Sequence, residues 1–207
     1  MKLSTTSFFS VIATLGIIAA VSACAHTDRF AGTWQGNPER MDNVPGVADA
    51  VSTITLDFAP DATDKSKGIV DIMAVMEVSQ AVAGIAEDTN VPYQANITAT
   101  ATISGQYTSD HEGEDLLVSF DSSSLKVNVD PSGVSFSENI ITGTERPVLD
   151  SLTAATADRW RVILSSAIRD RFNSYRRIED IKIHHGDMLS CEVDDRDLTF
   201  RRVGVPD

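Results

Sequence analysis

Several stretches of the chain alternate apolar and polar residues, which is the pattern of a half-buried β-strand. The most regular one runs from Ile97 to Tyr107, with Ile, Ala, Gly and Tyr at one set of positions and Thr, Ser and Gln at the other. We therefore expect one face of this strand to be buried and the other to be wet or to line a polar cavity. Further strands are predicted around residues 29–34, 52–58, 69–78, 116–120, 125–129, 134–136, 181–183, 189–193 and 198–202.

Turn-forming residues separate these strands. Asp130-Pro131-Ser132-Gly133 combines residue types that favour a tight turn. Segments 37–50, 60–67 and 110–115 are predicted as loops or turns, and residues 80–92 as a loop or a short helical turn. About eight to ten strands separated in this way predict a mainly β, antiparallel domain.

The period changes between Pro147 and Asp180, where apolar residues recur at helical spacing. We expect one amphipathic helix of about five turns, near residues 154–177, with Thr153 or Thr156 as its N-cap. Its large apolar residues, like Met73 and Met76, are interpreted as core rather than as a ligand platform. The residues that carry the helical period are Trp160, Ile163, Leu164, Ala167, Ile168, Phe172 and Tyr175.

The first residues have the pattern of an export signal. Lys2 precedes an almost unbroken run of apolar and small residues from Phe8 to Val21. The run is slightly short for a membrane-spanning helix and lacks a basic flank after it, so residues 1–23 are predicted to be a cleaved signal peptide. A retained N-terminal membrane helix is the alternative.

The end of this signal, Val21-Ser22-Ala23-Cys24, resembles the lipobox of bacterial lipoproteins, with Val21 in place of the usual leucine. The resemblance implies that the Cys24 thiol carries a diacylglyceryl group and anchors the protein to a membrane. Ala25 instead of Asp after the cysteine is similar to the outer-membrane sorting signal of Gram-negative bacteria, which implies a cell-envelope protein facing the periplasm or the surface. Ordinary secretion, with Ala23-Cys24-Ala25 as the cleavage site, is the alternative.

The charge of the chain limits its partners. The formal net charge is −13, and it becomes −14 without residues 1–23, because that segment contains Lys2 and no acidic residue. An acidic surface disfavours nucleic acid, and it offers no basic patch to anionic lipid head groups. Membrane attachment would therefore depend on the lipid alone. The second cysteine, Cys191, occupies an apolar position of an alternating stretch and is predicted to be a small buried hydrophobic residue.

Two short motifs resemble those of lipocalins. Gly32-Thr33-Trp34 lies at the start of the first predicted strand, and Leu198-Thr199-Phe200-Arg201-Arg202 lies in the last. The resemblance implies that residues 24–207 form one antiparallel, lipocalin-like β-barrel, in which Arg201 or Arg202 packs over the Trp34 ring and closes the barrel. The chain departs from the family in lacking its Thr-Asp-Tyr motif and in the position of its helix relative to two final strands instead of one.

No cluster of residues predicts catalysis, a metal or a cofactor. His184 and His185 beside Asp187, with His111 and Glu112, were weighed as a metal site, but adjacent residues of a strand point to opposite faces. No Gly-x-Ser-x-Gly motif or phosphate-binding loop is present. The acidic runs 110–115 and 194–197 are interpreted as solvated turns rather than Ca²⁺ ligands.

Three functions follow from these expectations. The first is a non-catalytic module that binds a small hydrophobic ligand, since the small residues Ala99, Ala101 and Gly105 on the inward face would leave room inside a barrel. The second is a structural or interaction subunit of an envelope complex, without a small-molecule ligand. The third, an enzyme such as a hydrolase, has the least support.

Overall fold

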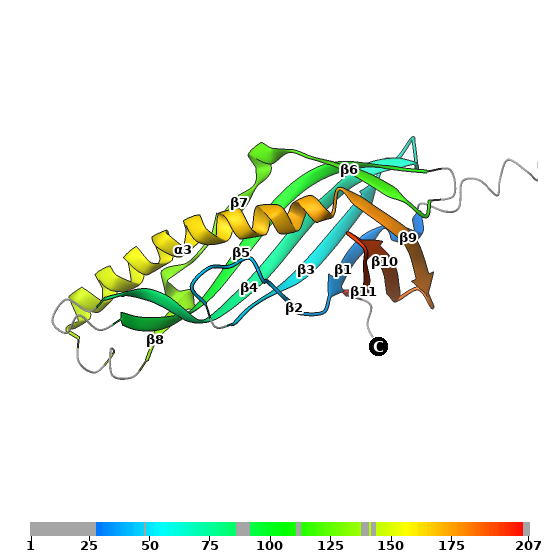
Figure 1. Ribbon diagram of the computed structural model, residues 1–207. Helices are drawn as coiled ribbons and strands as arrows, with labels where there is room; N and C mark the ends of the chain where they lie inside the picture. Colours follow the sequence, from blue (N-terminus) through cyan, green and yellow to red (C-terminus); the bar gives the residue numbers. More distant parts are fainter. Residues whose placement is uncertain are drawn as a thin grey trace, which may run out of the picture.

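The computed structural model describes residues 28–47, 49–85, 92–110, 113–137, 141 and 144–204. In this part of the chain, eleven strands form one antiparallel sheet, and the long helix α3 (Arg146–Ser174) packs along it (Figure 1). The mainly β class expected from the sequence is therefore confirmed. The strands are β1 (Gly32–Gly36), β2 (Glu39–Arg40), β3 (Asp49–Pro60), β4 (Lys67–Ile85), β5 (Pro92–Ser109), β6 (Leu116–Phe120), β7 (Lys126–Asn128), β8 (Val134–Phe136), β9 (Arg177–His184), β10 (Met188–Val193) and β11 (Arg196–Arg202).

The sheet closes in a ring. Its strands follow one another in the order β1, β11, β10, β9, β6, β5, β4 and β3, and β3 pairs again with β1. The closing strand β1 is therefore paired on both sides, with Trp34 opposite Arg202 of β11 and opposite Leu56 of β3. The short strand β2 also pairs with β3. Strands β7 and β8 pair with the part of β5 that does not pair with β6.

The central strands β4 and β5 are longer than the sequence pattern predicted, because β4 contains a bulge. Its buried residues fall on every second position up to Val78, but the next buried residue is Ala81. Between them Gln80 adopts a φ of 53°, and its backbone N–H donates to Asn96 Oδ1 at 3.1 Å. The inserted residue reverses the alternation, so the prediction of a loop or helical turn from residue 80 was wrong for residues 80–85, which continue the strand.

Helix α3 also differs from its prediction: it spans Arg146–Ser174 instead of 154–177. The proposed caps were wrong, since Thr153 lies inside the helix, where its hydroxyl donates to the Leu149 carbonyl, and the helix begins at Arg146 with Pro147 in its first turn. The sequence pattern missed the first turns of the helix because no helix residue before Thr156 is fully buried. The apolar period therefore marks only the part of the helix that packs on the sheet.

The buried face of α3 fills the space in front of the long strands. The helix contacts β4, β5, β7 and β8, and its side chains belong to the same hydrophobic core as theirs. The inward face of β4 and β5 is rich in alanine, which leaves room for the large helix side chains. The buried residues of these elements include Ala74 and Ala81 of β4, Ala95, Ala99 and Ala101 of β5, and Trp160, Leu164, Ala167, Ile168 and Phe172 of α3.

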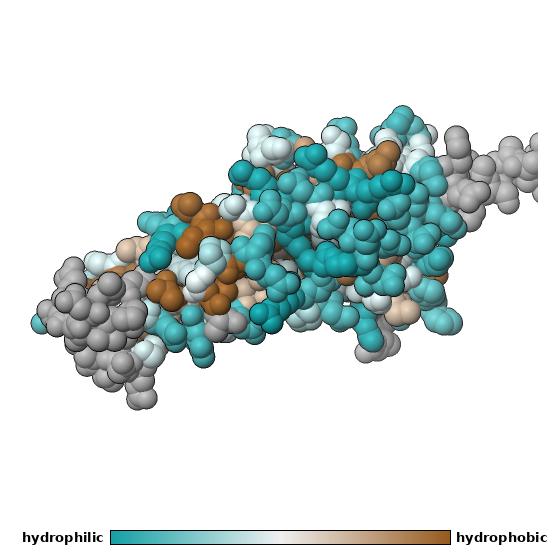
Figure 2. All heavy atoms as spheres, viewed as in Figure 1, coloured by the Kyte–Doolittle hydropathy of each residue, from teal (hydrophilic) through white to brown (hydrophobic). Residues whose placement is uncertain are grey.

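The core-residue predictions hold with one exception. Trp160, Phe172 and Met76 are buried, whereas Met73 is exposed because it points to the outer face of β4. Apolar side chains also reach the surface at the end of the molecule where α3 begins and the long strands end (Figure 2). Val82 near the end of β4 and Val148 in the first turn of α3 are exposed there.

Candidate functional site

The residues that resemble lipocalin motifs come together where the ring closes. The guanidinium of Arg202 lies 4.4 Å from the centre of the Trp34 ring, and its Nη2 donates to the Arg29 carbonyl at 3.0 Å. The indole Nε1 of Trp34 donates to the Phe30 carbonyl at 2.9 Å. Gly32 has a φ of 108° and lies under the Arg202 guanidinium. These contacts tie the first strand to the last, and a partly shielded cation–π pair contributes about 1 kcal/mol.

Arg201, the other arginine considered as the residue that packs over Trp34, is exposed. It lies between Gln35 of β1 and Met188 of β10 in the sheet, with its side chain on the face opposite that of Arg202. Cys24, the predicted lipidation site, lies outside the described residues, as do His26, His111 and Glu112.

The two neighbouring histidines do not share a site. The Nε2 of His184 lies 2.9 Å from Ser190 Oγ of the adjacent strand, whereas His185 is exposed in the turn after β9 with a φ of 52°. Within the described ranges, no group of three His, Cys, Asp or Glu side chains is placed to hold a metal ion. The His184–Ser190 contact joins two strands and was not predicted, because nothing in the local sequence links the two residues.

The described residues of both acidic runs make turn contacts. The Asp110 carboxylate accepts hydrogen bonds from the backbone N–H groups of Gly113 and Glu114, at 2.7 and 3.0 Å. Asp194 and Asp195 form the connection between β10 and β11, and both have left-handed backbone conformations. This explains the acidic residues through turn chemistry.

A group of charged residues that the sequence did not reveal lies where β2, α3 and β11 meet. Glu39 Oε2 accepts from Arg171 Nη2 and also lies 3.0 Å from Arg196 Nη1. The side chains of Glu39 and Arg171 are 27% and 12% exposed, while that of Arg196 is 40% exposed and forms the rim. We call Glu39, Arg171 and Arg196 the Glu39 cluster. Because two arginines face one carboxylate, the cluster has a surplus of one positive charge.

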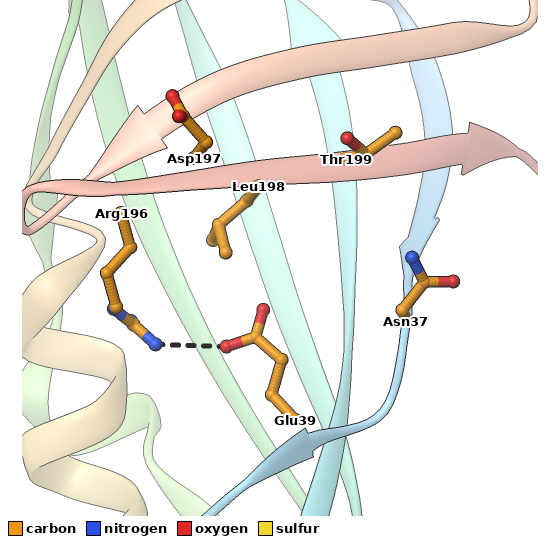
Figure 3. Close-up of a pocket in the computed structure, with 6 residues that line it drawn as sticks. All are labelled: Asn37, Glu39, Arg196, Asp197, Leu198 and Thr199. Carbon is orange, nitrogen blue, oxygen red and sulfur yellow. Dashed lines mark hydrogen bonds and ion pairs between the residues drawn. The ribbon is translucent and has the colours of Figure 1, made fainter.

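An open hollow of about 370 Å³ lies in front of this cluster. Figure 3 shows Arg196 and Leu198 of β11 pointing toward Glu39, whereas Asp197 and Thr199 point to the other side of the strand. The hollow therefore combines charged, amide and apolar groups. Its lining residues are Asn37, Glu39, Arg196, Asp197, Leu198 and Thr199.

Buried polar groups lie behind the Glu39 cluster. Ser52 is the partner of Glu39 in the β2–β3 pairing, so their side chains leave the sheet on the same face. Tyr175 follows Arg171 by one helical turn, and burial raises the pKa of its hydroxyl. Burial also raises the pKa of the Cys191 thiol to about 12, as expected for a small buried residue and not for a nucleophile.

Sequence reasoning missed this site because its members are far apart along the chain. Glu39 is 132 residues from Arg171 and 157 from Arg196. No motif spacing links such residues, and each alone is typical of a solvated charge. No helix in the described part of the chain is long and apolar enough to cross a membrane. Comparisons of the chain with family models, curated proteins and solved structures found no match.

Proposed function

We propose that the protein is a non-catalytic structural or interaction subunit of the cell envelope, held at a membrane by a lipid on Cys24. The observation that carries this proposal is the filled interior: the buried face of α3 occupies the concave side of the long strands. The hollow in front of the Glu39 cluster is open and lies at the surface, and so does a second hollow beside Ile69 and Phe120. A protein built in this way acts through its surface.

The finer description of the fold is part of the same proposal. We describe the ring as a lipocalin-like β-barrel, supported by the Arg202 guanidinium over the Trp34 ring and by the pairing of β1 with both β3 and β11. An outer-membrane destination remains a proposal from Ala25, and it assumes a Gram-negative envelope.

Two experiments test this function. Labelling with radioactive palmitate should mark the wild-type protein and not the Cys24→Ala variant, and an unlabelled wild type would remove the anchor. Cross-linking in cells, followed by purification from solubilised membranes, should recover a second protein in a fixed ratio. Recovery of this chain alone would contradict the interaction role.

A second candidate is a binding module for a small hydrophobic ligand. The observation in its favour is the alanine-rich inner face of β4 and β5, together with the first turns of α3, in which no side chain is fully buried. A ligand would have to displace part of the helix. Trp160 reports such a movement in a Trp34→Phe variant, because it lies on the buried face of α3. Saturable quenching of Trp160 by a brominated alkyl probe would favour this candidate, and unchanged fluorescence would exclude it.

A further inference from the structure

The segment between β1 and β3 covers one side of the interior. Residues 37–47, which we call the strap, contain β2 and the loop that follows it, and they run alongside α3 (Figure 1). Met41 and Val44 of this loop are 5% and 6% exposed, so the strap contributes two apolar side chains to the hydrophobic core. The strap is therefore part of the wall around the core.

The two sides of the strap are held in different ways. Toward β3, strand β2 pairs in the sheet, and the Met41 N–H adds a backbone hydrogen bond of 2.8 Å. Toward α3, the strap makes no backbone–backbone hydrogen bond among the described residues. Side chains hold this side: Glu39 accepts from Arg171. Asn43 Nδ2 donates to the Ala167 carbonyl at 3.2 Å. The contact of the strap with α3 is therefore the weaker of the two.

The far end of the strap contacts β4 beyond its bulge. The pairing of β4 with β3 ends at Ser79, so β3 does not reach the last residues of β4. There the Val82 N–H donates to the Gly46 carbonyl of the strap at 3.2 Å, and Gly46 has a φ of 75°. The Val82 amide is therefore protected by the strap and not by β3.

Unpaired polar atoms lie next to the Glu39 end of the strap. Ser52 Oγ, Tyr175 Oη and Arg171 Nε are buried without a hydrogen-bond partner among the described residues. Ser52 is the cross-strand partner of Glu39, and the charge of Glu39 acts on the Tyr175 hydroxyl. Movement of the strap away from α3 hydrates these atoms, and this offsets part of the apolar burial that the strap loses.

We propose that the strap opens away from α3 as a local unit, while the sheet stays folded, and that small apolar molecules reach the interior by this route. The side held by side chains alone gives way, and β2 keeps the strap attached to β3. Such an opening takes less free energy than global unfolding, because few buried apolar groups and few backbone hydrogen bonds are lost. It also frees one flank of α3, which a ligand in the interior has to displace. The route rests on the ligand-binding candidate of the proposed function, whereas the opening is tested without a ligand.

The thiol of Cys191 reports the opening. Cys191 is 4% exposed and lies near the strap, because the charge of Glu39 acts on its thiol and its cross-strand partner Leu198 points toward Glu39 (Figure 3). In a Cys24→Ser protein it is the single thiol of the chain, so its rate of alkylation by iodoacetamide measures the population of the open state. We expect this rate to be nearly independent of urea at low concentration, because opening exposes little surface, and to rise steeply only where the chain unfolds.

Two variants assign the opening to the strap. Asn43→Ala removes the hydrogen bond to α3 and should raise the alkylation rate at low urea about fivefold, the effect of one net hydrogen bond. Ile72→Val is the control, because it trims a buried residue of β4 opposite Leu56 and lowers the stability of the whole fold by a similar amount. It should leave the rate at low urea unchanged. Hydrogen exchange of the Val82 amide, whose acceptor belongs to the strap, should become faster in Asn43→Ala by the same factor.

Three results would overturn the proposal or one part of it. If alkylation follows the urea dependence of global unfolding at every concentration, or if Asn43→Ala reacts no faster than Ile72→Val, the strap does not open as a local unit. Quenching of Trp160 by the brominated alkyl probe without an effect of Asn43→Ala would retain the ligand and overturn the strap as its route. An opening seen by both measurements without any quenching of Trp160 would retain the local opening and overturn the route.

Discussion

At the scale of single residues, the contacts that matter most join distant parts of the chain. Arg202 stacks on Trp34 and donates to the Arg29 carbonyl, whereas its neighbour Arg201 lies on the outer face of the same strand. The two side chains have the same chemistry and differ only in the face from which they project. Substituting each of them in turn therefore measures how much the Arg202 contacts stabilise the ring closure.

We expect Arg202→Ala to lower the free energy of unfolding by about 1–3 kcal/mol, because it removes the cation–π contact and a charge-assisted hydrogen bond. Arg201→Ala should change the free energy of unfolding by less than about 0.5 kcal/mol. Urea unfolding of both variants, followed by circular dichroism in a Cys24→Ser background, measures the difference. Equal effects of the two substitutions would show that the stacking does not stabilise the closure.

The outer face of the last three strands carries a row of like charges. Glu192 faces Glu179 of β9 and Asp197 of β11 in the sheet. Partial burial first, and then these carboxylates with Asp195 and Asp180, raise the pKa of Glu192. A raised carboxyl pKa means that the folded state holds the proton more tightly than the unfolded state. The ionised form is therefore unfavourable at neutral pH, and stability is regained as the pH falls through the folded pKa.

Glu192→Gln should accordingly raise the midpoint of thermal unfolding at neutral pH. The gain should decrease with added salt and disappear once the pH is low enough to protonate the wild-type Glu192. Glu77→Gln is the control, since Glu77 is exposed and pairs with Val51 and Thr98, which carry no charge. A gain at Glu77 as large as that at Glu192 would assign the effect to net charge rather than to this row.

At the scale of elements, only part of the helix α3 packs on the sheet. Leu164 is fully buried against the sheet, whereas Val162, two residues earlier, is 73% exposed. We expect Leu164→Ala to cost about 2–5 kcal/mol, because it removes buried surface and leaves a cavity. Val162→Ala should be neutral or slightly stabilising, because alanine is the better helix former. Thermal and urea unfolding of the two variants compare them, and a Leu164→Ala variant as stable as Val162→Ala would contradict the packing of α3.

The elements also show how far the sequence alone could predict the fold. Strict alternation identified β5 and the first part of β4, because a sheet with one buried face imposes a period of two. The bulge at Gln80 was not visible, since its positive φ depends on the Asn96 side chain of the next strand. The first turns of α3 were missed because they are not fully buried, and the Glu39 cluster because only the folded chain brings its members together.

At the scale of the whole molecule, the closed ring of strands and the part of the long strands that α3 covers share one hydrophobic core. Buried residues run without a break from Phe30 and Trp34 at the ring closure to Trp160 and Leu164 under α3. The strands β3, β4 and β5 pass through both parts, so neither has a separate set of backbone pairings. A single core with shared strands is expected to unfold as one cooperative unit.

The two tryptophans allow this expectation to be tested, because one lies in each part and the chain contains no others. In Trp160→Phe the fluorescence reports the ring closure through Trp34, and in Trp34→Phe it reports the contact of α3 with the sheet through Trp160. Each substitution shifts stability, so circular dichroism is recorded on the same sample as an internal reference. We expect the fluorescence and circular dichroism midpoints to coincide within each variant. A Trp160 transition that precedes the circular dichroism transition would show that α3 leaves the sheet before the ring opens, which is the movement that a hydrophobic ligand would require.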